Sequence, residues 1–188
     1  YQNTYDRIRK PGSYQVAPYV IEKGMKTHGV NMIFSYFYYQ LGKITEREDI
    51  CEVGYELAME VLQDFYVKEK DAVLEIVTLD GEFSDTPAGR TYVPGYVIEC
   101  MWFLISIFED RKESEKVHLC CQLIRRHIEL GMDCKKGGIM LALDIDGKKP
   151  CFWNKPTYKP WWVQLETLVA TAYAYKHTQE EGFMDIHK

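Results

Sequence analysis

The sequence has no block of basic residues, no apolar run long enough to span a bilayer and no cysteine pair with C-x-x-C spacing. Its formal net charge is −5 at pH 7, so neither a nucleic acid nor an anionic membrane surface is expected as a main partner. No secretory signal is visible, and the chain begins at Tyr1 without an initiator methionine, which is typical of a piece of a longer protein.

Cysteine chemistry is also expected to be absent. Four of the six cysteines lie in apolar helical patterns, where thiols behave as small buried hydrophobic groups: Cys51, Cys100, Cys120 and Cys121. We therefore expect reduced thiols in a cytoplasmic protein, with no disulfide and no metal site.

The central feature that is present is the stretch from Gly89 to Ile105, in which Gly, Pro and Gly precede a strongly apolar run. This pattern predicts a buried helix with Pro94 in its first turn. Tyr96 and Glu99 are three residues apart and share one face of that turn, close to backbone amides without helical partners. They form either one wall of a pocket or merely the polar end of a capped core helix.

A second stretch, Lys159 to Ala170, has the same order of features: proline, aromatic residues, an amide, a carboxylate two residues later and an apolar helix. Together the two stretches resemble the N-acylglucosamine 2-epimerase family, which includes cellobiose 2-epimerases and several aldose–ketose isomerases. The matching residues, in order, are Gly89-Arg90, Pro94-Gly95, Glu99, Trp102-Phe103-Leu104, Gly137-Gly138, Asp144-Ile145-Asp146-Gly147, Lys159, Trp161-Trp162 and Glu166.

The resemblance implies an all-α fold, half of an (α/α)6 barrel with short β-hairpins at one end. Family members are about twice as long, so residues 1–188 are expected to form a single domain equivalent to the C-terminal half. Residues 1–22 are interpreted as an irregular lead-in and residues 178–188 as a polar tail. A half-ring exposes apolar helix faces unless the missing N-terminal half or a second copy, as in a homodimer, covers them. From the hydrophobic pattern alone, a helical bundle or solenoid is also possible.

The apolar spacing predicts helices over residues 23–41, 45–66, 94–109, 113–130 and 160–177. Gly42 is expected to end the first helix, and Thr45 with Glu48 to form a capping box at the start of the second. Gly131 is expected as a left-handed cap after the fourth.

Short strands are predicted between the helices. Residues 71–78 favour a short strand or a hairpin, followed by an Asp80-Gly81 turn. A further strand covers residues 137–144 and enters an Asp146-Gly147 turn, with a return strand over residues 151–153. The short spacing between Asp144, Asp146 and Gly147 favours a turn over a calcium loop.

The reaction that the resemblance implies removes a proton next to a carbonyl and needs positioned acid/base groups with pKa values near the working pH. Tyr96 and Gln164 stand where the family has its two acid/base histidines. Tyrosine has a reference pKa of about 10, and glutamine only forms hydrogen bonds. His28 lies in a segment that some family members use to face the sugar, although a histidine at a helix start is often structural.

The remaining candidates bind the substrate or tune its chemistry. Glu75, Glu99 and Glu166 match family carboxylates, with helix-end or loop charges as the alternative role. Arg90 is a candidate donor to a sugar oxygen, or else the partner of one of these carboxylates. Trp161 and Trp162 offer apolar faces for a pyranose ring, or pack in the core.

The resemblance therefore implies a carbohydrate epimerase or isomerase acting at C2 of a free reducing mono- or disaccharide through an enediolate, without metal or cofactor. The replacements Tyr96 and Gln164 leave open a non-catalytic carbohydrate-binding relative. A glycosidase of related fold, with Glu99 and Glu166 flanking a glycosidic bond, is a third possibility.

Overall fold

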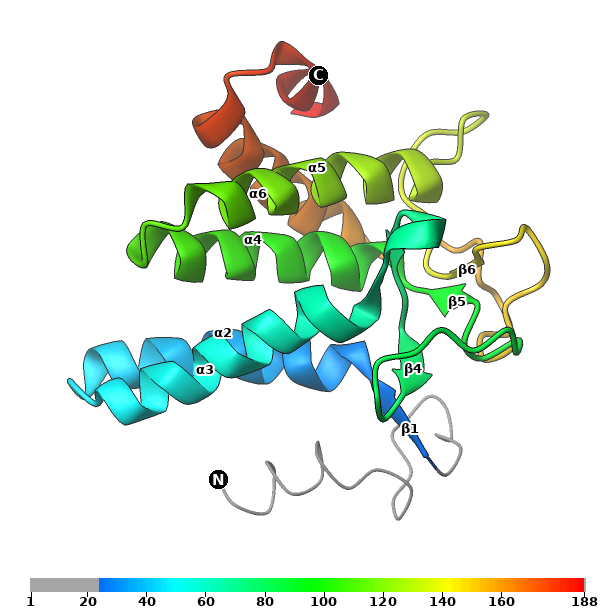
Figure 1. The fold of residues 1–188 in the computed structure, drawn as a ribbon. Coiled ribbons are helices and arrows are strands. Elements are labelled where there is room, and N and C mark those ends of the chain that lie inside the picture. The colour runs from blue at the N-terminus through cyan, green and yellow to red at the C-terminus, as the bar shows by residue number, and fades with distance from the viewer. Residues whose placement is uncertain (1–23, 188) are drawn as a thin grey trace.

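Three long helices lie side by side in the computed structural model, which describes residues 24–187 (Figure 1). They are α2 (His28–Ile44), α4 (Pro94–Asp110) and α6 (Trp161–Thr178), and α4 contacts both of the others. Helix α3 (Glu48–Glu60) packs against α2, and α5 (Ser114–Gly131) packs against α4 and α6. The result is a double layer of helices, as expected for part of an (α/α)6 barrel. The predicted lead-in, residues 1–22, lies outside the described residues.

Short strands gather at one end of the helices (Figure 1). Strand β1 (Met25–Thr27) pairs antiparallel with β4 (Ile76–Thr78), and β5 (Thr91–Tyr92) pairs antiparallel with β6 (Leu143–Asp144). Because β1 leads directly into α2, and β5 is followed closely by α4, these pairs hold the N-termini of two helices at the same end.

The central helix α4 is apolar on nearly all sides because it is covered by α2, α5 and α6. Ile98, Met101, Leu104 and Ile105 are completely buried. Pro94 occupies the first turn, where its missing N–H costs no helical hydrogen bond. The buried helix predicted from the central stretch is therefore confirmed.

The junction between α2 and α3 differs from the prediction. Gly42 does not end α2 but lies buried inside it, where a Cβ would be 2.5 Å from the Cys51 sulfur. The glycine thus allows α2 and α3 to approach closely. Thr45 donates its hydroxyl to the Leu41 carbonyl and closes α2, while Arg47 occupies the N-cap of α3. The predicted capping box of Thr45 and Glu48 is wrong.

The segment between α3 and α4 contains more short elements than predicted. Helix α3 continues as a π-helix (η1, Val61–Phe65), followed by strand β2 (Tyr66–Val67), a 3-10 turn (η2, Lys68–Lys70) and β3 (Ala72–Val73), which pairs with β2. Residues 71–78, predicted as a short strand or a hairpin, therefore contain two short strands, β3 and β4, which pair with different partners.

The break between these two strands contains Glu75. Its backbone N–H donates to Thr91, and its carbonyl accepts the N–H of His28. This arrangement ties Glu75 to the N-terminus of α2.

Two further local predictions fail after α4. Gly131 is the last residue of α5 and not a left-handed cap, and a Cβ there would lie within 3 Å of both Pro94 and Ile139. Strand β6 pairs with β5, whereas residues 151–153 form no strand. The predicted Asp146-Gly147 turn is present, with Gly147 at a φ of +74° and its N–H bonded to the Asp144 carbonyl.

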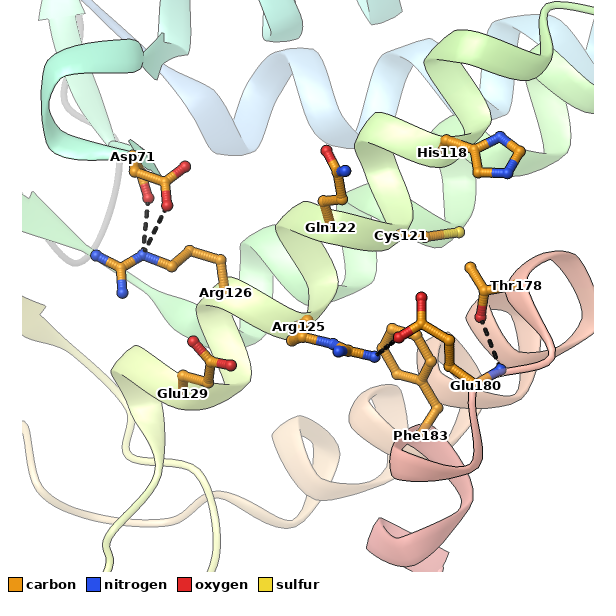
Figure 2. Close-up of a pocket in the computed structure, with 10 residues that line it drawn as sticks. All are labelled: Asp71, His118, Cys121, Gln122, Arg125, Arg126, Glu129, Thr178, Glu180 and Phe183. Carbon is orange, nitrogen blue, oxygen red and sulfur yellow. Dashed lines mark hydrogen bonds and ion pairs between the residues drawn. The ribbon is translucent and has the colours of Figure 1, made fainter.

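The C-terminal segment folds back on the helices. A 3-10 helix (η3, Glu181–His187) contacts α6, and its Phe183 is buried. Figure 2 shows the groove between α5 and this segment, where Arg125 pairs with Glu180 beside the Phe183 ring. The residues expected as a polar tail thus contribute an apolar anchor.

Helices α2 and α6 each carry an exposed apolar edge. On α2 this edge consists of Phe37, Leu41 and Ile44, of which Ile44 is 80% exposed. On α6 it includes Trp161, which is 75% exposed, and Leu165. Among residues 24–187, no helix is both long enough and apolar enough to cross a membrane.

Candidate functional site

A pocket of about 490 Å³ opens where the N-terminal parts of α2, α4 and α6 meet. Its apolar wall comes from the first turns of α2, including Val30, Ile33 and Phe34. Its polar groups come from the first turns of α4 and α6, and they include four predicted site residues: Tyr96, Glu99, Trp162 and Glu166.

The two carboxyl groups of the pocket differ in their surroundings. Burial, followed by the charge of Glu166, raises the pKa of Glu99 to about 7. Glu166 accepts a hydrogen bond of 2.8 Å from the indole N–H of Trp102. The pocket therefore holds one carboxyl group with its pKa raised to about 7 and one that accepts a hydrogen bond from a tryptophan.

Tyr96 packs face to face on Trp162, with ring centres 5.3 Å apart. Burial raises the pKa of Tyr96, and the nearby charges of Glu75 and Glu99 raise it further. The phenol therefore stays protonated near neutral pH and is suited to donate a hydrogen bond, not to remove a proton.

His28 and Glu75 lie behind the pocket wall. His28 is completely buried, with Nδ1 3.7 Å from a carboxylate oxygen of Glu75 and its ring edge against Phe65. Glu75 is also buried, and its other oxygen lies 3.5 Å from the position that a Cβ on Gly29 would take. These two side chains support the first turn of α2 and have no direct opening to the pocket.

Gln164 points away from the pocket toward the backbone of the preceding loop. Its side-chain carbonyl accepts the N–H of Ile139 at 2.9 Å, and its NH₂ donates to the carbonyls of Ile139 at 3.0 Å and Pro160 at 3.2 Å. The amide thus uses both of its N–H donors and one of its two acceptor lone pairs to hold this loop.

Arg90 and Trp161 also lie apart from the pocket residues. Arg90 pairs with Asp85 at 2.6 Å and with Asp144 at 3.1 Å, so its partners are not the glutamates considered in the sequence analysis. Trp161 is largely exposed at the start of α6. The structure therefore gathers four of the nine predicted site residues, with His28 and Glu75 behind them and Gln164, Arg90 and Trp161 elsewhere.

Sequence reasoning missed Trp102 as a member of the site. It noted the residue only as part of a motif, although Trp102 follows Glu99 by three residues and so lies on the same side of α4. It also missed the apolar wall of α2, because its members look like ordinary core residues.

Comparison with known proteins identifies the family. Residues 41–188 match the N-acylglucosamine 2-epimerase (GlcNAc 2-epimerase) family. The chain is 29% identical to the N-acylglucosamine 2-epimerase of Bos taurus over 137 residues, which are 72% of this chain and 32% of the bovine protein. It is 28% identical to the enzyme of Rattus norvegicus over 153 residues, 78% of this chain and 35% of that protein.

Solved structures show the same fold. A D-mannose isomerase crystal structure matches 88% of this chain and 42% of its own, with a TM-score of 0.73 and 23% identity. The cellobiose 2-epimerase from Bacillus thermoamylovorans matches 86% of this chain and 39% of its own, with a TM-score of 0.67 and 20% identity. The fold is thus that of part of an (α/α)6 barrel.

The chain spans about a third of the length of the curated relatives that it matches. The family match covers far more than half of the chain and includes α4 and α6, which contribute Tyr96, Glu99, Trp162 and Glu166 to the pocket. The chain belongs to the N-acylglucosamine 2-epimerase family.

Proposed function

We propose that the protein is a sugar epimerase or isomerase that moves a proton at C2 of an open-chain reducing sugar. The observation that carries this proposal is Glu99, a carboxyl group in a pocket, with its pKa raised to about 7. A general base is most effective when its pKa lies near the working pH. Family membership supports the same class of chemistry.

In the proposed step the Glu99 carboxylate takes the proton from C2. The electrons of the C2–H bond form the C1=C2 double bond of an enediolate, and the negative charge moves to the carbonyl oxygen. Tyr96 donates a hydrogen bond to that oxygen, and donors aimed at developing charge lower the barrier. Trp162 offers the sugar an apolar ring face.

Return of the proton decides the product. Delivery by Glu99 to C1 on the same face converts an aldose into a ketose, while the proton of the C2 hydroxyl passes to the negatively charged C1 oxygen as the C2 carbonyl forms. Only one carrier is needed for the carbon-bound proton. Epimerisation at C2 needs a carrier on the opposite face, and His28 is buried behind the pocket wall. The site therefore favours aldose–ketose isomerisation within the proposed class.

The test is ¹H NMR of reducing sugars in D₂O with the purified protein, using D-mannose, an N-acylglucosamine and cellobiose. We expect deuterium to appear at C2 of at least one sugar and E99Q to abolish that exchange. E56Q is the matched control, because Glu56 is exposed on α3 and makes the same charge change away from the pocket. Saturation-transfer contact without exchange would favour the non-catalytic binding relative. The absence of both contact and exchange would refute both proposals.

We further propose that the exposed apolar edges of α2 and α6 are covered in the working protein. The covering helices come from an N-terminal half such as the longer relatives carry, or from a second copy in a homodimer. Light scattering distinguishes the two, since only a homodimer doubles the molar mass and loses this mass when Leu41 or Leu165 is replaced by Asp.

The state of the cysteine thiols is relevant to the cellular compartment of the protein. All six cysteines are free, and Cys51, Cys100, Cys120 and Cys121 are buried. Because reduced thiols are typical of reducing compartments, this supports the proposal of a cytoplasmic protein.

A further inference from the structure

Trp102 connects the two helices that carry the pocket carboxyl groups. It lies one turn after Glu99 on α4, and its indole N–H donates to Glu166 on α6 at 2.8 Å. Its ring packs on Tyr173 with centres 5.5 Å apart, and against the edges of Phe103 and Tyr36 at 4.4 and 5.5 Å. The direction of the N–H bond is therefore fixed by packing on three sides.

This single donor matters because the pocket holds no cationic group. Among the described residues that line it, none is Lys, Arg or His. A hydrogen bond donated to a carboxylate stabilises its ionised form. Glu166 has such a donor in Trp102, whereas burial and the charge of Glu166 raise the pKa of Glu99.

The other titratable groups around the pair do not replace this donor. Strand β1 and helix α2 line the pocket with residues that do not titrate, namely Thr27, Gly29, Val30, Met32, Ile33 and Phe34. Helix α4 adds Tyr96, and the break between β3 and β4 adds Glu75, which faces His28. Behind Trp102 lie Tyr36 and Tyr173, and burial raises the pKa of Tyr36.

We propose that Trp102 is the positioning residue that distinguishes the two carboxyl groups, because its indole N–H holds Glu166 as a hydrogen-bond acceptor and so leaves Glu99 as the group that carries the proton to be transferred. The catalytic meaning of this assignment rests on the proposed function. The location of the proton does not, since it can be measured without any sugar.

The experiment reads each carboxyl group separately by ¹³C NMR titration of glutamate side chains. In E99Q only Glu166 of the pair remains, and adding W102F should raise its titration midpoint by about one pH unit. In E166Q, W102F should leave the midpoint of Glu99 unchanged, because Trp102 bonds only to Glu166 of the two. W161F in the E99Q protein is the control, since Trp161 is an exposed tryptophan of α6.

An unchanged Glu166 midpoint in the protein with E99Q and W102F would overturn the proposal. Near-UV circular dichroism establishes that W102F keeps its packing. If it does not, replacing Trp102 by benzothienylalanine removes the N–H and keeps the ring shape, with the same expected shift.

A functional readout follows if the sugar exchange assay is positive. With W102F, part of the shared proton moves to Glu166 and leaves Glu99 ionised below its normal midpoint. We therefore expect exchange at about pH 6 to rise relative to that at about pH 8, with KM unchanged because Trp102 does not line the pocket. If the parent protein catalyses no deuterium exchange, the proposed function is refuted, but the titration result remains valid.

Discussion

Replacing Gln164 by histidine tests whether the side chain at this position is a structural clamp in this chain. The Gln164 side chain makes three hydrogen bonds to backbone groups of Ile139 and Pro160. These bonds hold the loop before β6 against the first turn of α6. Because β6 pairs with β5 just before α4, the clamp supports the end of the fold where the pocket opens.

The expected cost follows from those bonds. An imidazole cannot both donate to and accept from the backbone of one residue, because its two ring nitrogens point in different directions. Q164H keeps at most one of the three bonds, and each lost bond costs about 1 kcal/mol net. We expect the free energy of unfolding to fall by about 2 kcal/mol, which lowers Tm by about 4–8 °C in a chain of this size.

The assay is urea and thermal unfolding at a pH where histidine is neutral. Q122H is the matched control, because Gln122 is exposed on α5, and a surface substitution should change stability by less than about 0.5 kcal/mol. If Q164H is as stable as the parent protein and Q122H, the bonds to Ile139 do not contribute as argued, and Gln164 is free to be redirected.

Three further predictions concern stability. The pKa of Glu99 is raised from 4.5 to about 7, so its ionisation costs stability as pH rises through this window. Discounted for solvent screening of this partly exposed group, E99Q should be more stable than the parent above pH 7 by about 2 kcal/mol and equal to it in acid, measured by urea unfolding. Burial lowers the pKa of His127 to about 4 while its ring accepts the Val73 N–H. Stability from His127 is therefore complete above about pH 6.5 and declines toward pH 4, and H127Q should remove that part of the pH dependence. G54A should cost about 2 kcal/mol or more because its Cβ would lie 2.5 Å from a backbone nitrogen of α2, whereas G182A, with open space around it, should be neutral in the same assay.

The helices were predictable because their signals are local. The helix expected over residues 94–109 is α4 (Pro94–Asp110), and those expected over 113–130 and 160–177 are α5 and α6 within one residue at each end. In each case the repeat of apolar residues is longer than two turns. Packing against neighbours therefore reinforces what the sequence pattern already favours.

The prediction errors have a common physical cause. Contacts between distant segments override local sequence signals, such as a glycine near a helix end. The pattern predicts that Gly42 ends a helix and that Gly131 forms a left-handed cap, but each glycine instead lies where another element approaches closely, Cys51 in one case and Pro94 in the other. The prediction of strand pairing was wrong for the same reason. Strand β5 at Thr91 finds its partner at Asp144, far along the chain, and nothing local in either short strand encodes that choice.

Helical geometry explains which site residues meet. Tyr96 and Glu99 are separated by three residues on α4, and Trp162 and Glu166 by four on α6, so each pair shares one helix face. Gln164 lies two residues from Trp162 and two from Glu166, which places it about 200° around the helix axis from each of them at 3.6 residues per turn. It therefore points to the opposite side of α6.

This periodicity has a consequence for the chemistry. In this chain the side of α6 that faces the pocket bears Glu166, and the side bearing Gln164 faces Ile139. Under the proposed function, proton transfer uses the carboxyl groups on the pocket side of α4 and α6. A histidine at 164 would have to release Ile139 and turn the start of α6 before it could approach a sugar, whereas the carboxyl pair needs no such rearrangement. For this reason we propose Glu99, and not the residue at 164, as the acid/base group.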